Sequence, residues 1–229
     1  MSGAPPGGPL SARAARVFLR PIGNPLPLGF LALAAATLSV SGLQLGWFES
    51  EEGENVAVIL IAFVFPLQLL TSIFGYLGRD VVAGTGMGIL AGTWLTVGLV
   101  MAGNPPGSTS DALGLFLLVC AVAMVVPAIA AAGGKLVPAA VLFTTAARFA
   151  ATGIFELSAS DSWEDVAGVI GLVLCAFSLY AALAMALEDA QRQTVLPLLR
   201  RRGGRDAFAQ DFERQLAQLE HEAGVRKQL

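Results

Sequence analysis

The sequence predicts an all-α membrane protein with six transmembrane helices, from its composition and from the spacing of its charges. Of its 229 residues, 55% are hydrophobic and only 14% are charged, whereas an ordinary soluble domain carries roughly 25% charged residues. The charges are also grouped, so that long stretches contain none, and about 20 apolar residues suffice to span a bilayer. These observations exclude a typical soluble enzyme.

Five runs without Lys, Arg, Asp or Glu account for five of the six spans. They cover residues 21–48, 55–78, 81–110, 112–134 and 166–187. The remaining span, residues 136–156, is apolar apart from Arg148 until it closes with Glu156. Six helices of about 20 residues consume roughly half the chain and leave short loops. We therefore expect neighbouring helices to run antiparallel. We also expect no room for a second folded domain that could carry out catalysis.

The first run also resembles a secretory signal. Three arginines precede it, and Ala34-Ala35-Ala36 could serve as a cleavage site. Pro25 and Pro27 interrupt the would-be signal core, however, and the uncharged run continues to Phe48. We therefore interpret this segment as a retained span.

The loop charges predict the orientation, because Lys and Arg near the ends of spans stay on the cytoplasmic side. The basic residues of alternate connections and of both flanks fall on one side: Arg13, Arg16, Arg20, Arg79, Lys135, Arg192, Arg200, Arg201 and Arg202. The opposite loops carry only acids: Glu49, Glu51, Glu52, Glu54, Asp111, Glu156, Asp161, Glu164 and Asp165. Both termini are therefore expected in the cytoplasm.

Two terminal segments flank the transmembrane domain, which we place at residues 23–199. Residues 1–22 are expected to be disordered or to lie at the membrane interface, since the first nine are rich in Gly and Pro. Residues 200–229 are expected to form a cytoplasmic amphipathic helix, because apolar residues recur there at spacings of three and four. That stripe comprises Phe208, Phe212, Leu216, Leu219 and Ala223. The tail would serve self-association or bind a cytosolic partner, the alternative being a frayed, solvated helix.

The chemistry-bearing residues are too sparse for an enzyme. Cys120 and Cys175 lie within apolar runs and His221 lies in the polar tail, so neither a redox pair nor a metal cluster is indicated. The sequence shows no nucleophile–base pair and no phosphate-binding loop. We expect no cofactor, no metal and no nucleic-acid partner.

Three motifs along the spans resemble the acetate uptake transporters, the succinate–acetate permease family. The first is Asn24-Pro25-Leu26-Pro27-Leu28-Gly29, which enters the first helix. The second comprises Gln68, Tyr76, Thr85 and Trp94-Leu95-Thr96. The third comprises residues 167–172, Tyr180 and residues 194–197. Together they extend from about residue 24 to residue 198.

The resemblance implies a function that composition alone does not show. It implies a six-helix protomer that assembles into a homohexamer in the plasma membrane. Each protomer would carry acetate and similar short monocarboxylates along its own narrow path, passively or linked to protons. Its partners would be a small organic anion, the lipid bilayer and further copies of the chain.

We expect the solute path to begin at the entry motif and to continue inward. Asn24 is predicted to be the N-cap of the first helix, where free N–H groups suit a carboxylate, although an ordinary cap is equally consistent. Leu33 and Thr37 follow at helical spacing, and four further polar residues are hydrogen-bonding candidates or, alternatively, helix–helix contacts. The expected path residues are Asn24, Pro25, Leu28, Gly29, Leu33, Thr37, Gln68, Tyr76, Trp94, Thr145, Arg148 and Tyr180.

Arg148 departs from the family pattern, which has an apolar residue at about this position. It lies 12 residues after Leu136, which is roughly 18 Å along a helix and near the bilayer midplane. An arginine facing lipid there would cost at least about 2.5 kcal/mol. An anion site, a structural ion pair and a snorkelling side chain are the three interpretations, and the scarcity of acids in the spans favours the first.

Two further departures concern proton coupling. Gly75 and Met185 stand where the resemblance implies acidic residues, so a proton relay through those positions is in doubt. Besides a monocarboxylate channel or transporter, two other functions are consistent with the sequence. One is a channel for neutral solutes such as urea, amides or ammonia. The other is a membrane anchor whose tail recruits a cytosolic partner.

Overall fold

In the computed structural model, residues 23–191 and 193–200 are described, and nothing is stated of the others. The first of the six spans is α2 (Leu26–Gln44). The second, Ser50–Leu77, joins a short 3₁₀ turn to α3 (Gly53–Ile59), a π-helical turn (Leu60–Val64) and α4 (Phe65–Leu77). The other spans are α5 (Val81–Gly103), α6 (Asp111–Ala132), α7 (Leu136–Ser158) and α8 (Asp161–Gln191). All six are long and apolar enough to cross a membrane.

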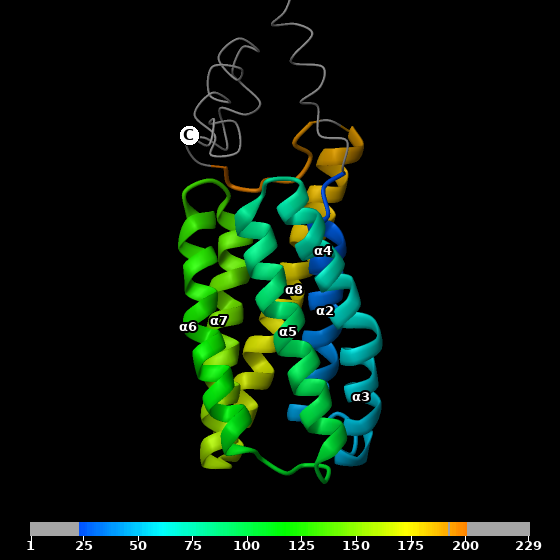
Figure 1. Cartoon of the computed structure of the whole chain (residues 1–229), viewed down its shortest axis with the longest axis vertical. Coiled ribbons are helices and arrows are strands. Elements are labelled where there is room, and N and C mark those ends of the chain that lie inside the picture. The colour runs from blue at the N-terminus through cyan, green and yellow to red at the C-terminus, as the bar shows by residue number, and fades with distance from the viewer. Residues whose placement is uncertain (1–22, 192, 201–229) are drawn as a thin grey trace, which may run out of the picture.

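These six helical spans correspond to the six predicted ones, and they run up and down as a bundle (Figure 1). The largest differences lie at the first and last spans. The first helix begins at Leu26, just after Pro25, and the chain turns at Gly46, whose φ of 64° suits a glycine. The last helix has 31 residues and continues into polar residues at both ends, because charged residues outside the apolar core can still extend a helix.

The π-helical turn Leu60–Val64 interrupts the second span directly before Phe65-Pro66. A proline has no backbone N–H and its ring clashes with the preceding turn of an α-helix. A single π-turn inside a helix changes the local hydrogen-bond pattern and can accommodate such a break. The second span therefore continues as one helical segment through Pro66.

Glycines allow α4 and α5 to approach closely. A Cβ at Gly75 would lie 2.8 Å from the backbone nitrogen of Gly84, and Gly84 itself lies beneath the Tyr76 ring. Gly84, Gly88 and Gly92 lie four residues apart on α5, a spacing of small residues that lets helices approach closely. Gly84 packs against α4, and Gly88 faces Ser72. The third member, Gly92, meets nothing within 4 Å in the protomer.

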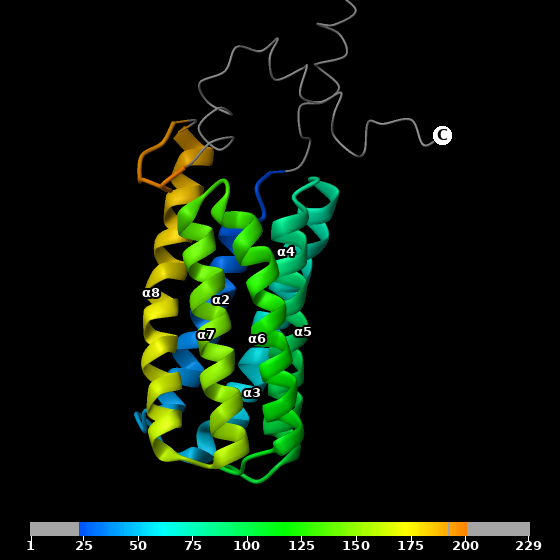
Figure 2. The same cartoon turned by 90° about the vertical axis from the view of Figure 1, so that its left-hand side faces the viewer.

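The charged connections separate to the two ends of the bundle. The connections that contain Arg79 and Lys135 lie at the same end as residue 23 and Arg200, as both views show (Figures 1 and 2). We call this the basic end. We call the opposite end, where Glu49 precedes the 3₁₀ turn and Asp161 begins α8, the acidic end. Both described ends of the chain therefore emerge at the basic end. The predicted N-terminal segment, residues 1–22, and the tail beyond Arg200 lie outside the described residues.

Candidate functional site

A cavity of about 540 Å³ lies at the acidic end, between α2, α5, α6 and α7. Its apolar wall is made by residues such as Leu43, Val97 and Phe155. Four carboxylates also line it: Glu49, Glu54, Glu156 and Glu164. We call this space the outer cavity.

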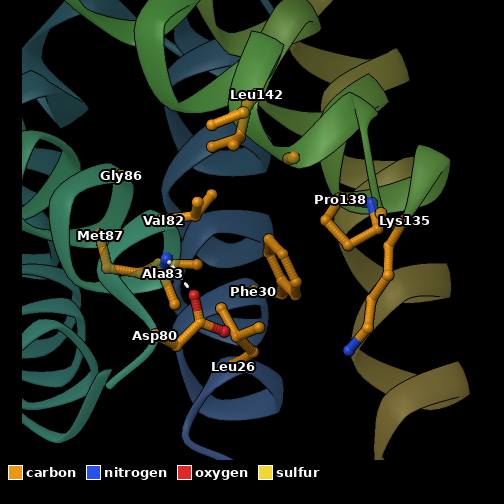
Figure 3. A pocket seen from close by; sticks show the side chains of 13 residues that line it. Leu26, Phe30, Asp80, Val82, Ala83, Gly86, Met87, Lys135, Pro138 and Leu142 are labelled. Carbon is orange, nitrogen blue, oxygen red and sulfur yellow. Dashed lines mark hydrogen bonds between the residues drawn. The ribbon is translucent and has the colours of Figure 1, made fainter. Parts of the chain in front are cut away.

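A second cavity, of about 200 Å³, lies at the basic end of the same four helices (Figure 3). It is mostly apolar, with Phe30 of α2, Met87 of α5 and Leu142 of α7 in its walls. Asp80 and Lys135 bring charge to it from the two connecting loops, on opposite sides of Phe30. The Asp80 side chain accepts a hydrogen bond from the Ala83 nitrogen at 2.9 Å and so caps α5. We call this space the inner cavity.

A layer of buried side chains separates the two cavities. On each of the four helices its members lie between residues that line the outer cavity and residues that line the inner one. We call this set the barrier layer: Leu33, Thr37, Leu90, Trp94, Met124, Thr145 and Phe149. The rings of Trp94 and Phe149 meet edge to face with centroids 5.9 Å apart. The layer therefore closes the axis between the cavities.

Arg148 lies beside this layer and is only 1% exposed. Its Nη1 donates to the Ser41 hydroxyl at 2.8 Å, and its Nη2 donates to the Gln44 amide oxygen at 3.2 Å. The guanidinium carbon is 6.0 Å from the centre of the Trp94 ring. Gln44 lines the outer cavity, so the guanidinium lies one side chain behind the cavity wall.

Neutral groups surround the Arg148 charge. Among the described residues, no carboxylate forms an ion pair with Arg148. Two acids near the ends of α7 and α8 have other partners, since Glu156 accepts from the Ser110 nitrogen at 2.7 Å and Glu188 pairs with Arg200. Because the side chain is buried within the protomer, it does not snorkel to lipid or reach a neighbouring subunit. Of the three interpretations of Arg148, this geometry shows neither an ion pair among the described residues nor a snorkelling side chain.

Five of the expected path residues come together in or beside the barrier layer: Leu33, Thr37, Trp94, Thr145 and Arg148. The two threonine hydroxyls bond within their own helices, Thr37 to the Leu33 oxygen and Thr145 to the Val141 oxygen, both at 2.8 Å. The Trp94 indole nitrogen is buried and has no hydrogen-bond partner among the described residues. A solute in this layer would therefore find an unpaired indole donor.

The entry motif lies at the basic end, and its cap differs from the prediction. Pro25, not Asn24, occupies the N-cap position of α2, and the Asn24 amide oxygen accepts from the Leu26 nitrogen at 3.1 Å. The predicted N-cap position was therefore wrong by one residue. The Asn24 side chain still satisfies a backbone N–H, that of the residue two positions ahead. Leu28, 37% exposed, faces outward, whereas Leu26 and Phe30 line the inner cavity.

Gly29 and Gln68 join α2 to α4 next to the inner cavity. A Cβ at Gly29 would lie 2.7 Å from the Met87 sulfur and 2.8 Å from the Thr71 methyl group, so only a glycine fits without movement. The Gln68 amide donates to the Gly29 oxygen at 3.4 Å, while its own Oε1 is buried without a partner. This pair positions α2, although neither residue lines the inner or the outer cavity.

The two tyrosines of the expected path lie away from both cavities. Tyr76 is 52% exposed, and its hydroxyl bonds with that of Thr85 at 2.9 Å. The Tyr180 hydroxyl donates to the Pro197 oxygen at 2.9 Å and so ties the segment after α8 to that helix. Both act as helix or segment contacts here, which is the alternative that the sequence left open.

Six residues of the barrier layer and of the Arg148 surroundings were not among the expected ones: Ser41, Gln44, Leu90, Met124, Phe149 and Gly171. Ser41 and Gln44 lie three apart on an apolar helix, a spacing that puts them on one face and could have indicated a polar site. Gly171 could not have been found, because its role depends on the Arg148 side chain that packs against it. Among the described residues, no group of His, Cys, Asp or Glu is placed to hold a metal ion.

Comparisons with known proteins give one family and one fold. The model of the GPR1/FUN34/yaaH family matches residues 6–200. The solved structure of the bacterial acetate channel SatP is similar to this chain with a TM-score of 0.69 and 22% identity. The similarity covers 77% of this chain and 99% of that one. Among curated proteins, none matches the chain significantly.

Proposed function

The chain belongs to the GPR1/FUN34/yaaH family, and we propose that it carries acetate and similar short monocarboxylates through the plasma membrane. It is a multi-pass membrane protein, a channel or transporter and not an enzyme. The similar structure of the acetate channel SatP supports this substrate class. The path that we propose runs from the outer cavity through the barrier layer to the inner cavity.

The observation that carries this proposal is the alignment of two cavities on one axis. Both are bounded by α2, α5, α6 and α7, at opposite ends of the bundle. One layer of side chains, closed by Trp94 and Phe149, lies between them. A conduction path needs such an arrangement, because access from each side must meet at a single constriction.

The constriction suits a small solute with an apolar part. Leu33, Leu90 and Phe149 would contact the methyl or alkyl group of a short carboxylate. An isolated ion crossing an apolar layer loses hydration worth several kcal/mol unless polar groups replace its water. The carboxylate end therefore needs a donor in or beside the layer.

We propose that permeation is passive. The barrier layer contains no Asp or Glu, and the two positions where the resemblance implies acids hold a glycine and a methionine. Gly75 lies against the backbone of Gly84 and leaves no space for a longer side chain without movement of α5. Met185 is fully buried. A proton relay would lack its usual carboxylate carriers.

We further propose that both termini are cytoplasmic and that protomers associate as a homohexamer. The Lys and Arg of the loops lie at the end from which both described chain ends emerge, which supports the orientation. Large apolar side chains cover the outer face of α6, including Val119, Val122 and Val126. Such a surface faces either lipid or a second protomer.

The test is uptake of radiolabelled acetate by proteoliposomes that contain the purified full chain, with empty vesicles as the control for acetic acid that crosses lipid unaided. We expect protein-dependent uptake at pH 7.5 that equilibrates acetate without concentrating it when an inward proton gradient is imposed. Protein-dependent accumulation above the empty-vesicle level would contradict passive permeation. Absence of protein-dependent acetate uptake would contradict the proposed function.

A neutral-solute channel is the second candidate, because four acids line the outer cavity and the barrier layer is apolar. The same vesicles, tested with urea and acetamide, distinguish the two. Uptake of neutral solutes without acetate would favour the second candidate. Absence of both fluxes would favour the membrane anchor, whose amphipathic tail lies outside the described residues.

A further inference from the structure

Arg148 is a buried cation without a counter-ion in the described part of the protomer. Its partners are a hydroxyl, an amide oxygen and the face of an indole, all neutral. A buried charge is costly unless an opposite charge or several hydrogen bonds compensate it. A protein that keeps an arginine in this position gains most when a mobile anion supplies the missing charge.

The position of the guanidinium is fixed from two neighbouring helices, α2 and α8. Ser41 and Gln44 of α2 accept from its two terminal nitrogens. Gly171 of α8 provides the space, because a Cβ there would lie 1.3 Å from Nη1 and 2.5 Å from Cζ. The planar head is therefore held in one place before any ligand arrives, which limits the entropy that binding would lose.

A second buried donor lies in the same layer. The Trp94 indole nitrogen has no hydrogen-bond partner among the described residues and the residue is 2% exposed. A buried N–H without an acceptor is uncommon in folded proteins and needs an explanation. An anion held by the guanidinium, which lies 6.0 Å from the Trp94 ring centre, would supply an acceptor within this region.

The route to this place leads through the outer cavity. Gln44 both lines that cavity and contacts Arg148. Thr152, one helical turn after Arg148 on α7, also lines it, whereas Phe149, the next residue, belongs to the barrier layer. Arg148 thus lies where the cavity ends and the barrier begins.

From these contacts we infer that Arg148 is a binding site for the carboxylate group of the permeating solute, at the outer side of the barrier layer. Ser41, Gln44 and Gly171 are positioning residues that hold the guanidinium. The site takes one monovalent carboxylate, because one uncompensated cation balances one negative charge. It makes this chain selective for anions over their neutral amides. The inference rests on the proposed function and deepens it.

The experiment compares acetate with acetamide, its neutral amide of similar size, in proteoliposomes at pH 7.5. The variants are Arg148→Leu, Arg148→Lys and the control Ser178→Ala, which changes a fully buried residue of α8 that lines neither cavity and whose hydroxyl donates to the Leu174 oxygen of its own helix. Replacing a buried charge that has no ion-pair partner by an apolar side chain is compatible with folding. Folding is checked by size-exclusion chromatography and thermal unfolding.

The expected result is a change in selectivity. The acetate-to-acetamide uptake ratio falls about 10- to 100-fold in Arg148→Leu, as the loss of charged hydrogen bonds implies. Arg148→Lys keeps the charge but not the fork of donors, so its ratio is intermediate, and Ser178→Ala keeps the wild-type ratio. A wild-type ratio in folded Arg148→Leu overturns the inference while leaving the proposed function intact. Should Arg148→Leu fail to fold, a wild-type ratio in Arg148→Lys overturns it instead.

A second measurement keeps the two proposals separate if the wild-type protein carries no acetate. Thermal unfolding of the detergent-purified chain is then compared in sodium acetate and in sodium chloride of equal ionic strength. Stabilisation by acetate in the wild type that is lost in Arg148→Leu supports the binding site even though the proposed function has failed. Equal stabilisation in both proteins, or none in either, overturns the site.

Discussion

The Arg148 guanidinium fills the space that Gly171 leaves on the facing helix, since a Cβ at Gly171 would lie 1.3 Å from its Nη1. The glycine of α8 and the arginine of α7 are thus a matched pair. A side chain at position 171 could not be added without moving the guanidinium. The hydrogen bonds to Ser41 and Gln44 depend on this fit.

Gly171→Ala is therefore expected to displace the guanidinium while keeping its charge. We predict a reduced acetate-to-acetamide uptake ratio and a loss of stability of about 1–3 kcal/mol, typical of overpacking. The matched control is Gly168→Ala, one turn away on the same helix, where the new methyl meets the Leu45 side chain and Gln44 Cβ instead of the guanidinium. Equal ratios in the two variants would show that Gly171 does not position Arg148.

The acids of the outer cavity are predicted to slow the arrival of anions. Glu164→Gln removes one negative charge from the cavity lining and should raise acetate uptake ~2-fold at low ionic strength, with the effect vanishing at physiological salt, where charges are screened beyond about 8 Å. Glu51→Gln is the control, because Glu51 lies at the same end but does not line that cavity. An identical salt dependence in both variants would contradict a specific role for the cavity.

The close contact between α4 and α5 predicts sensitivity at Gly75. Gly75→Ala would bring a methyl group to 2.8 Å from the Gly84 backbone nitrogen, and backbone cannot rotate away as a side chain can. We expect a lower melting temperature in detergent, corresponding to about 1–3 kcal/mol. Gly103→Ala on α5, where a Cβ meets nothing within 4 Å, should leave the melting temperature nearly unchanged. A neutral Gly75→Ala would show that the two helices have room to separate.

Tyr180 is predicted to contribute to stability and not to selectivity. Tyr180→Phe removes the hydrogen bond to the Pro197 oxygen and should cost about 0.5–1.5 kcal/mol of unfolding free energy. The acetate-to-acetamide ratio should stay at the wild-type value in the same preparation. A changed ratio would instead place Tyr180 on the solute path.

The sequence was sufficient to predict the six transmembrane helices, because long runs without charged residues strongly indicate membrane spans. Six helical spans lie where six were predicted, and their ends differ where local residues decide them, as at Pro25, Gly46 and the polar flanks of α8. The site was harder to predict. Leu33, Thr37 and Trp94 lie in the barrier layer, but whether a tyrosine faces the axis or a neighbouring helix depends on helix rotation. Tyr76, which packs over Gly84, illustrates that hydropathy does not determine that rotation.

The identity of the barrier is the central claim, and replacing Phe149 tests it most directly. Phe149→Leu removes the edge-to-face contact with Trp94 and narrows the side chain at the constriction, while Phe177→Leu makes the same change on the exposed face of α8. We predict that protein-dependent acetate uptake by proteoliposomes rises several-fold in Phe149→Leu and is unchanged in Phe177→Leu. Wild-type uptake in folded Phe149→Leu would contradict a path between the two cavities.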